Sequence, residues 1–436
     1  FCSDNAAAKA FYASSGDCAT NGTIIRVIMR DSCTNVVRPW TPFWPGNGSS
    51  GGINYEAVLI HELGHAAFGF PDTTLSTGVM HKDYNLHARY LAISAIDARS
   101  AVTQYGWTGL FPLTMSSSNA GVSWSSTSLY ESTTSFSPFP PALDTRYNTS
   151  IPTQGVNVFS YSATPQFRRG DHAAFSGHGS SPPTPETWSQ ATLAYSTYGE
   201  ILALHTTDCD LARHCSLQWM WSNNQGASWS TGVIAPSPAV GTFARAEAAY
   251  DVANDRFVVV YIRGDSARPY STWTYAASPV WSTPIYASLG EDPMPLRHMG
   301  GLVFDNAGTG LLVASAFRDN GPALGALSVL SPIVQMQVTL EPSGYRISNA
   351  SYARSYTWRS LARTRRNFGL ARSPEGQIVM AWRGTSSLRR LMISRKTSIA
   401  STSLFSAEEE QPITVTNGVD IGYSQGSSSF VVGFPW

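Results

Sequence analysis

The chain has 436 residues, carries no formal net charge, and consists of only 13% charged residues. That length exceeds the usual span of one hydrophobic core, so two domains are expected. Charged residues make up roughly 25% of an average globular protein. Their place is taken here by Ser, Thr, Gly, Asn and aromatic residues, which is typical of a β-rich protein. A neutral chain lacks the basic surface that binds nucleic acid, and no apolar run reaches the roughly 18 residues that span a bilayer.

Five cysteines are present, and no two of them are spaced as Cys-x-x-Cys, which argues against a cysteine metal site. Cys209 and Cys215 lie close together in a polar stretch and are expected to form a disulfide. Cys18 with Cys33 is the next pair, which leaves Cys2 free or bonded to a removed segment. Disulfides indicate an exported protein, and the abrupt start without a signal peptide suggests a processed or trimmed product.

Residues 1–108 have a mixed α/β pattern. Residues 23–30 are rich in β-branched side chains and are expected to form a strand. Residues 36–53, rich in Pro, Gly, Trp and Ser, are expected to form a loop. Residues 55–68 have a helical pattern with Gly and Pro just after it, and residues 91–105 predict a second helix.

From about residue 110 the pattern changes to strand-like runs separated by Gly, Asn and Ser turns. An apolar strand, a polar turn and a second apolar strand recur together, at intervals of about 52 residues for most copies. This interval suits the four short strands of a propeller blade. The copies are Leu193–His205, Ala248–Tyr261, Leu302–Phe317, Phe368–Trp382 and Ile421–Val432.

A second motif, S-x-N-x-G-x-x-W, overlays these repeats at residues 117–124 and 222–229, and its closing Trp-Ser recurs at residues 281–282. In such a turn the polar side chain binds backbone amides, Gly supplies a positive φ, and Trp packs between blades. The motif resembles the Asp-box of sialidase-like (BNR) propellers, with Asn in place of Asp. The resemblance implies an all-β propeller over residues 109–436. At the interval of the repeats this segment holds six blades, or seven if the blades are tight.

The sequence HELGH occupies residues 61–65 on the first predicted helix. This spacing places two imidazoles on one helix face, where both can bind Zn²⁺, and directs Glu62 towards the metal-bound water. A catalytic zinc also needs a third protein ligand. No Glu occurs between Glu62 and Glu131, so we expect that ligand in the segment directly after the helix.

The longer sequence HELGHAAFGFPD at residues 61–72, followed by Val-Met at residues 79–80, resembles the metzincin zinc proteases, particularly the matrixins and the snapalysin-like enzymes. The resemblance covers about residues 20–108 and includes the final predicted helix. It implies an α+β zinc-protease domain over residues 1–108. The implied roles are His61, His65 and Asp72 as zinc ligands, Glu62 as general base and Met80 as the Met-turn residue.

One spacing departs from that family, because Asp72 follows His65 by seven residues where the family has six. A one-residue bulge at the helix end would absorb the difference. Otherwise His81, Asp83 or His87 is the third ligand. The segment before the motif is also shorter than a full metzincin domain, so the domain is expected to be N-terminally incomplete or completed by another segment. Calcium stays open as a second metal.

Three arginines, Arg263, Arg318 and Arg383, each follow the second strand of a repeat. Arginine pairs with carboxylates in a bidentate manner, so these residues are candidates for binding an acidic sugar or a protein C-terminus at one propeller face. The alternative is that each pairs locally with a neighbouring acid such as Asp265 or Asp319. No nucleophile and acid pair of a sialidase is evident in the sequence.

The sequence therefore predicts a secreted zinc metalloendopeptidase that hydrolyses protein or peptide substrates, with a propeller that recognises the substrate, a glycan or another cell-surface ligand. The alternative is a non-catalytic propeller adhesin whose metzincin-like domain is structural. A third hypothesis is a glycan hydrolase that works through the propeller.

Overall fold

The computed structural model divides the chain into two compact units. One unit consists of Phe1–Thr108 with Asp210–Arg213, and the other of Gly109–Cys209 with His214–Trp436. The residues that the structure describes are 8–12, 23–27, 40–41, 53–54, 112–129, 142–143, 157–161, 165–171, 174–177, 191–207, 215–224, 226–236, 242, 245–263, 268–286, 296–316, 331–352, 363–364, 368–384, 389–415, 418–425 and 427–435.

The described residues of the first unit form four short strands in two sheets. Strand β1 (Ala8–Tyr12) pairs with β2 (Thr23–Val27) in antiparallel orientation, and β3 (Trp40–Thr41) pairs with β4 (Ile53–Asn54) in parallel. Strand β2 lies within the segment that the β-branched residues had marked as a strand.

The α+β fold class predicted for the N-terminal domain is wrong for the residues that the structure describes, because all of their regular structure is strand and none of it is helix. The two predicted helices, over residues 55–68 and 91–105, lie outside those residues. Helical periodicity is a local signal, and a short segment can carry it without the domain that a family motif implies around it.

The described strands of the second unit form six antiparallel sheets in chain order, each with four strands and one with a fifth. No described residue of this unit is helical, and no helix of the described chain could cross a membrane. The first sheet consists of β7 (Ala142–Leu143), β8 (Asn157–Tyr161), β9 (Pro165–Asp171) and β10 (Ala174–Gly177), and the second of β11 (Thr192–Tyr195), β12 (Ile201–Thr207), β13 (Ser216–Ser222) and β14 (Ser230–Ala235). The third consists of β15 (Glu247–Asp251), β16 (Arg256–Arg263), β17 (Arg268–Tyr275) and β18 (Ile285–Tyr286), and the fourth of β19 (Leu296–Phe304), β20 (Gly310–Ala316), β21 (Ser331–Glu341) and β22 (Gly344–Tyr352), with β23 (Arg363–Thr364) beside β21. The fifth consists of β24 (Gly369–Arg372), β25 (Ile378–Arg383), β26 (Arg390–Lys396) and β27 (Glu409–Thr414), and the sixth of β28 (Asp420–Ser424), β29 (Ser429–Pro435), β5 (Pro112–Ser117) and β6 (Ser128–Leu129).

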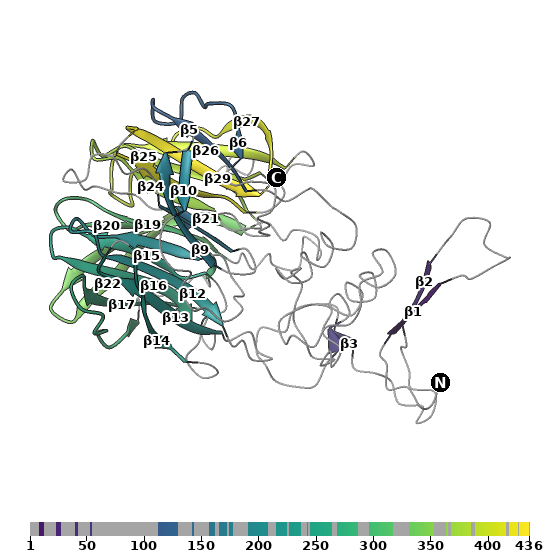
Figure 1. Ribbon diagram of the computed structural model, residues 1–436, viewed down its shortest axis with the longest axis horizontal. Helices are drawn as coiled ribbons and strands as arrows, with labels where there is room; N and C mark the ends of the chain where they lie inside the picture. The colour runs from purple at the N-terminus through teal and green to yellow at the C-terminus, as the bar shows by residue number, and fades with distance from the viewer. Residues whose placement is uncertain are drawn as a thin grey trace. The chain divides into compact units, whose positions relative to one another are not determined.

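These sheets are arranged as a β-propeller (Figure 1). The innermost strand of each sheet contacts the innermost strand of the next, in the order β7, β11, β15, β19, β24 and β28, and β28 contacts β7 again. The last sheet joins two strands from the C-terminal end of the unit to two from its N-terminal end. Strand β29 pairs with β5 from Phe430 opposite Ser117 to Pro435 opposite Pro112, and this pairing closes the ring.

Burial falls from the axis of the propeller to its rim. Every residue of the inner strands β11, β15, β24 and β28 is buried, whereas the outer strand β27 alternates between half-buried and exposed residues. Inner strands approach each other closely enough to require glycine. A Cβ on Gly301 would lie 2.4 Å from Leu370 Cβ, and one on Gly369 would lie 2.6 Å from the backbone nitrogen of Ile421.

The five strand-turn-strand repeats of the sequence are the hairpins β11–β12, β15–β16, β19–β20, β24–β25 and β28–β29. In each, a polar residue at the end of the first strand organises the turn. Asp305 Oδ1, for example, accepts the N–H groups of Ala307 and Thr309 at 2.9 and 2.8 Å. Ser196 Oγ accepts the N–H of Glu200 in the same way.

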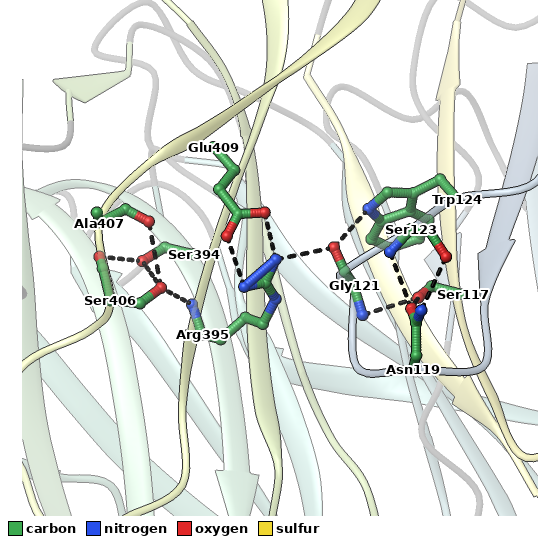
Figure 2. A network of polar contacts seen from close by, with 10 residues as sticks. All are labelled: Ser117, Asn119, Gly121, Ser123, Trp124, Ser394, Arg395, Ser406, Ala407 and Glu409. Atoms are coloured by element: carbon green, nitrogen blue, oxygen red, sulfur yellow. Dashed lines mark hydrogen bonds and ion pairs between the residues drawn. The ribbon is translucent and has the colours of Figure 1, made fainter.

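The S-x-N-x-G-x-x-W motif is confirmed as a hairpin turn, between β5 and β6 in its first copy (Figure 2). Asn119 Oδ1 accepts the Ser117 hydroxyl and the Ser123 N–H, both at 2.9 Å, and Gly121 donates its N–H to Ser117 Oγ at 2.8 Å. Gly121 has φ +83°, which only glycine adopts without strain. The indole of Trp124 donates to the Gly121 carbonyl at 3.0 Å.

The second copy, between β13 and β14, has the same geometry. Asn224 Oδ1 accepts the Ser222 hydroxyl at 2.9 Å and the Ser228 N–H at 2.8 Å, and Gly226 donates its N–H to Ser222 Oγ at 2.8 Å. Asn thus fills the role of the Asp in an Asp-box, since its amide oxygen accepts the same backbone donor.

A related turn that sequence reasoning missed follows β26. Lys396 stands where the other turns have serine, and its ammonium donates to Gln335 Oε1, to the Ala400 carbonyl and to the Ser403 carbonyl at 3.0, 2.8 and 3.1 Å. Burial lowers the pKa of Lys396 to about 8. The turn is longer than the motif and has Phe405 in place of Trp, so its sequence does not match the pattern S-x-N-x-G-x-x-W.

Candidate functional site

The axis of the propeller encloses a small cavity to which the innermost strand of every sheet contributes, from Leu143 on β7 to Asp420 on β28. Its volume is about 40 Å³. That is room for roughly two or three water molecules and too little for a sugar ring or a peptide. Most of the residues that line it are apolar, and the charged ones are Arg245, Glu247 and Asp420.

These three charged side chains form one buried ion cluster. The Arg245 Nε lies 2.9 Å from Glu247 Oε1, and its Nη2 lies 3.2 Å from Asp420 Oδ1. All three side chains are only 3% exposed. Charged groups are rarely buried so completely unless they are paired, and here one guanidinium serves two carboxylates.

Each member of the cluster is positioned by the start of an inner strand. Glu247 is the first residue of β15 and Asp420 the first residue of β28. The Leu143 N–H of β7 donates to Asp420 Oδ2 at 2.9 Å. The Arg245 Nε donates to Thr192 Oγ1 of β11 at 2.8 Å. Four of the six sheets therefore hold this cluster directly.

Burial shifts the protonation of both acids. It raises the pKa of Glu247 to about 8, with Arg245 opposing the rise and Asp420 adding to it. Burial also raises the pKa of Asp420, against which Arg245 and the Leu143 N–H act. With a pKa of about 8, Glu247 carries a proton at neutral pH, whereas the contacts of Asp420 with Arg245 and the Leu143 N–H favour the charged form of that acid.

The arrangement supplies one proton donor and one carboxylate within reach of the same water-sized cavity. Glu247 Oε1 is fully buried and lies 2.9 Å from Arg245 Nε in an ion pair, but without the geometry of a hydrogen bond. A protonated carboxyl without an internal acceptor is available to a group that enters the cavity. Two acids whose environments give them different protonation states are the usual basis of general acid–base chemistry.

The zinc site predicted from the sequence lies outside the described residues, so no contact among its members can be given. This applies to all of its residues, which are His61, Glu62, His65, Asp72, Met80, His81, Asp83 and His87. Among the residues that are described, no three His, Cys, Asp or Glu side chains come together as a metal site. Zinc and calcium binding stay predictions.

The arginines predicted to bind a ligand are distributed over the propeller. Arg263 ends β16 and Arg383 ends β25, on sheets that are not neighbours, and Arg318 lies outside the described residues. The Arg263 guanidinium lies over the ring of Tyr270, 5.3 Å from its centroid, so a local contact accounts for it. The ligand-binding role of these residues stays a prediction.

Of the cysteines, only Cys215 is among the described residues, and it is disulfide-bonded. Its partner is not among those residues. The predicted pairs Cys209–Cys215 and Cys18–Cys33 therefore stay predictions.

Sequence reasoning missed Arg245, Glu247 and Asp420. A signal was present, because each charge lies at or directly before the start of an apolar strand, in a chain that has only 13% charged residues. A charge next to a buried strand has to be paired, and the pairing joins residues far apart in the sequence. Arg245 and Asp420 lie on different sheets, and they come into contact only because the ring of sheets closes.

Comparisons with known proteins give distant structural likenesses only. No known family profile and no curated protein matches the chain. Among solved structures, an α-L-arabinanase of Penicillium chrysogenum, complexed with arabinobiose, is 10% identical with a TM-score of 0.47, over 76% of this chain and 98% of its own. An α-L-arabinofuranosidase of Fusarium graminearum, in complex with an iminosugar inhibitor, is 12% identical with a TM-score of 0.45, over 69% and 98%. An ulvan-lyase structure is 10% identical with a TM-score of 0.39, over 65% and 72%.

These findings overturn the predicted identity of the chain. The metzincin resemblance has no support in them, since the solved structures named above are carbohydrate-active enzymes and none is a peptidase. The zinc endopeptidase and the non-catalytic adhesin are therefore both withdrawn. A short motif on a predicted helix is a local signal, and it does not determine the identity of a chain in which the propeller is much the larger part. At these identities, with TM-scores below 0.5, the likenesses do not assign an activity, so the axial cluster is the best-defined site of the chain.

Proposed function

We propose that the propeller is a glycan hydrolase whose catalytic groups are Glu247 and Asp420. The observation that carries this proposal is a single one. Two fully buried carboxylates, one of them protonated at neutral pH, share Arg245 in a cavity that the inner strands of all six sheets line. Glycosidic bonds are cleaved by such a pair of carboxyl groups, with one acting as acid and the other as base or nucleophile.

In the proposed reaction, Glu247 passes its proton through a water molecule of the cavity to the oxygen of the glycosidic bond as that bond breaks. Asp420 accepts a proton from a water molecule, whose oxygen forms the new bond to the anomeric carbon. The proton then returns from Asp420 to Glu247, which restores both groups. Arg245 keeps Asp420 ionised and fixes the orientation of both carboxyl groups. The cavity holds water rather than sugar, so the glycan lies at the end of the axis where the inner strands begin.

A glycan is also the partner that fits the structures to which the chain is similar. The arabinanase was solved with arabinobiose and the arabinofuranosidase with an iminosugar inhibitor. An arabinan is therefore the first substrate to try. The disulfide at Cys215 supports export to an oxidising compartment, where extracellular polysaccharides are found.

The test is release of reducing sugar from a panel of polysaccharides, including arabinan, by the full chain and its variants. Glu247→Gln and Asp420→Asn are each expected to lower the rate by about 10²–10⁴-fold, the range of general acid–base catalysis. Glu410→Gln serves as the control, because Glu410 is a rim acid whose side chain is 53% exposed. Activity that survives both axial substitutions would remove the proposal.

A further inference from the structure

A second recess lies between two neighbouring sheets, away from the axial cluster. It is a groove of about 570 Å³ lined by residues of the sheets β15–β18 and β19–β22. Its volume is within the roughly 300–1,000 Å³ of typical ligand pockets. Arg256 pairs with Asp251 at the end of β15, whereas Glu247 begins that strand. The groove therefore opens at the opposite end of the propeller from the axial carboxylates.

The groove contains a cation that aromatic rings hold in place. The Arg256 guanidinium carbon lies 3.9 Å from the ring centroid of Trp273 and 5.2 Å from that of Tyr275. Its Nη2 lies 3.4 Å from the Tyr275 hydroxyl, a weak hydrogen bond, and its Nε makes none. No carboxylate among the described residues forms an ion pair with Arg256. The guanidinium also interacts with the Tyr345 hydroxyl, which donates to Asp251, so the Asp251 carboxylate reaches Arg256 only through a tyrosine. A planar cation is thus fixed in position without a direct ion pair.

The other polar groups of the groove do not neutralise this cation. Glu341 pairs with Arg346 at 3.2 Å, so its charge is already matched. The hydroxyl residues Ser282, Thr283 and Ser343 also line the recess. Gly344 keeps it open, because a Cβ there would lie 2.5 Å from Ile285 Cδ1.

We propose that this groove binds an acidic sugar unit of a polysaccharide, with the carboxylate or sulfate of the sugar on Arg256. Guanidinium groups match planar carboxylates with two parallel hydrogen bonds and bind sulfate oxygens in a similar way. Tyr275 is half exposed, so its ring is accessible to the apolar face of a sugar. The groove is separate from the axial pair, and the inference does not depend on the catalytic proposal.

Titration calorimetry of the full chain tests the inference with three probes. Trigalacturonate carries carboxylates only, a sulfated dextran oligosaccharide carries sulfates only, and maltotriose is neutral. We expect at least one anionic probe to bind, less tightly at high salt, and maltotriose to bind weakly or not at all. The anion that binds identifies the acidic group.

Two substitutions should act in opposite directions. Arg256→Gln is expected to weaken binding of the anionic probe about tenfold or more, because it removes a charged hydrogen-bond donor. Glu341→Gln should tighten binding about two- to threefold, because it releases the positive charge of Arg346 that Glu341 now neutralises. Misfolding cannot produce a gain in affinity. Arg390→Gln, on the sheet β24–β27, is the matched control and should bind as the wild type does.

The axial variants distinguish this inference from the proposed function. Glu247→Gln should bind the anionic probe with unchanged affinity, whatever its activity. Binding that depends on Glu247 but not on Arg256 would overturn the groove site, as would equal affinity for maltotriose or no binding of either anion at millimolar concentration.

Discussion

At the scale of single residues, the unusual feature of this chain is a charge cluster enclosed by apolar strands. Arg245, Glu247 and Asp420 are each almost fully buried. Burial of two acids with one base is costly unless one acid is protonated, and the pKa of Glu247, raised to about 8, meets that condition. The same residues therefore connect the stability of the ring to the chemistry proposed for it.

The first prediction concerns the dependence of stability on pH. Glu247 has a pKa near 4.5 when unfolded and about 8 when folded, so between these values the folded state binds more protons than the unfolded state. The free energy of unfolding should therefore fall as the pH rises from about 5 to 8. Urea unfolding of the wild type, followed by tryptophan fluorescence across that range, measures the fall.

Glu247→Gln removes this titrating group while keeping the size of the side chain. Its unfolding free energy should depend less on pH over the same range. Glu341→Gln, at an exposed site, should retain the dependence of the wild type. Parallel pH profiles for wild type and Glu247→Gln would show that Glu247 is not protonated in the folded protein.

At the scale of elements, the turns that close the hairpins were the most predictable part of the molecule. The pattern S-x-N-x-G-x-x-W specifies its own hydrogen bonds, so the residues 117–124 and 222–229 identified their turns without any tertiary information. The hairpin repeat was readable for the same reason, because apolar strands and polar turns alternate locally.

The elements that were not predicted depend on contacts distant in the sequence. The strand β7 has only two residues, Ala142 and Leu143, and gives no repeat signal, yet its Leu143 N–H binds Asp420. Lys396 occupies a serine position in a longer turn and is held by Gln335 of another sheet. Local periodicity cannot report such contacts.

The second prediction tests the Asn of the turn. Asn224→Ala removes the acceptor of the Ser222 hydroxyl and the Ser228 N–H and should lower the free energy of unfolding by about 1–2 kcal/mol. Asn224→Asp keeps the accepting oxygen and should be nearly neutral. Thermal unfolding of the two variants and the wild type distinguishes these outcomes. Equal destabilisation by Ala and Asp would contradict the role assigned to Asn as an Asp-box acceptor.

The third prediction concerns the glycine of the same turn. Gly226 has φ +87°, a left-handed conformation that costs an L-residue about 1–2 kcal/mol. Gly226→Ala should therefore destabilise the protein by about that amount, as measured by chemical denaturation. Ala227→Gly is a control at the next position. A neutral effect of Gly226→Ala would mean that the turn adopts another conformation in solution.

At the scale of the whole molecule, stability depends on closing the ring. The sheet β28–β29–β5–β6 combines two strands from the C-terminal end of the unit with two from its N-terminal end. Each pair of strands completes its sheet only by pairing with the other. Arg395 adds a link across the neighbouring sheet, because it donates to the Gly121 carbonyl at 3.1 Å and pairs with Glu409 (Figure 2). A defect in this sheet should therefore destabilise the whole propeller rather than one edge of it.

The last prediction compares two aspartates placed in that one sheet. Val432 of β29 is fully buried, whereas Val122 in the turn between β5 and β6 is 64% exposed. Val432→Asp places an unpaired charge in the core at the ring closure and should cost about 4 kcal/mol or more, which is enough to unfold a marginally stable domain. Val122→Asp should leave the melting temperature within a few degrees of the wild type. If Val432→Asp instead melts in two steps, with the larger one at the wild-type temperature, the other sheets are stable without the closure and the ring is not a single cooperative unit.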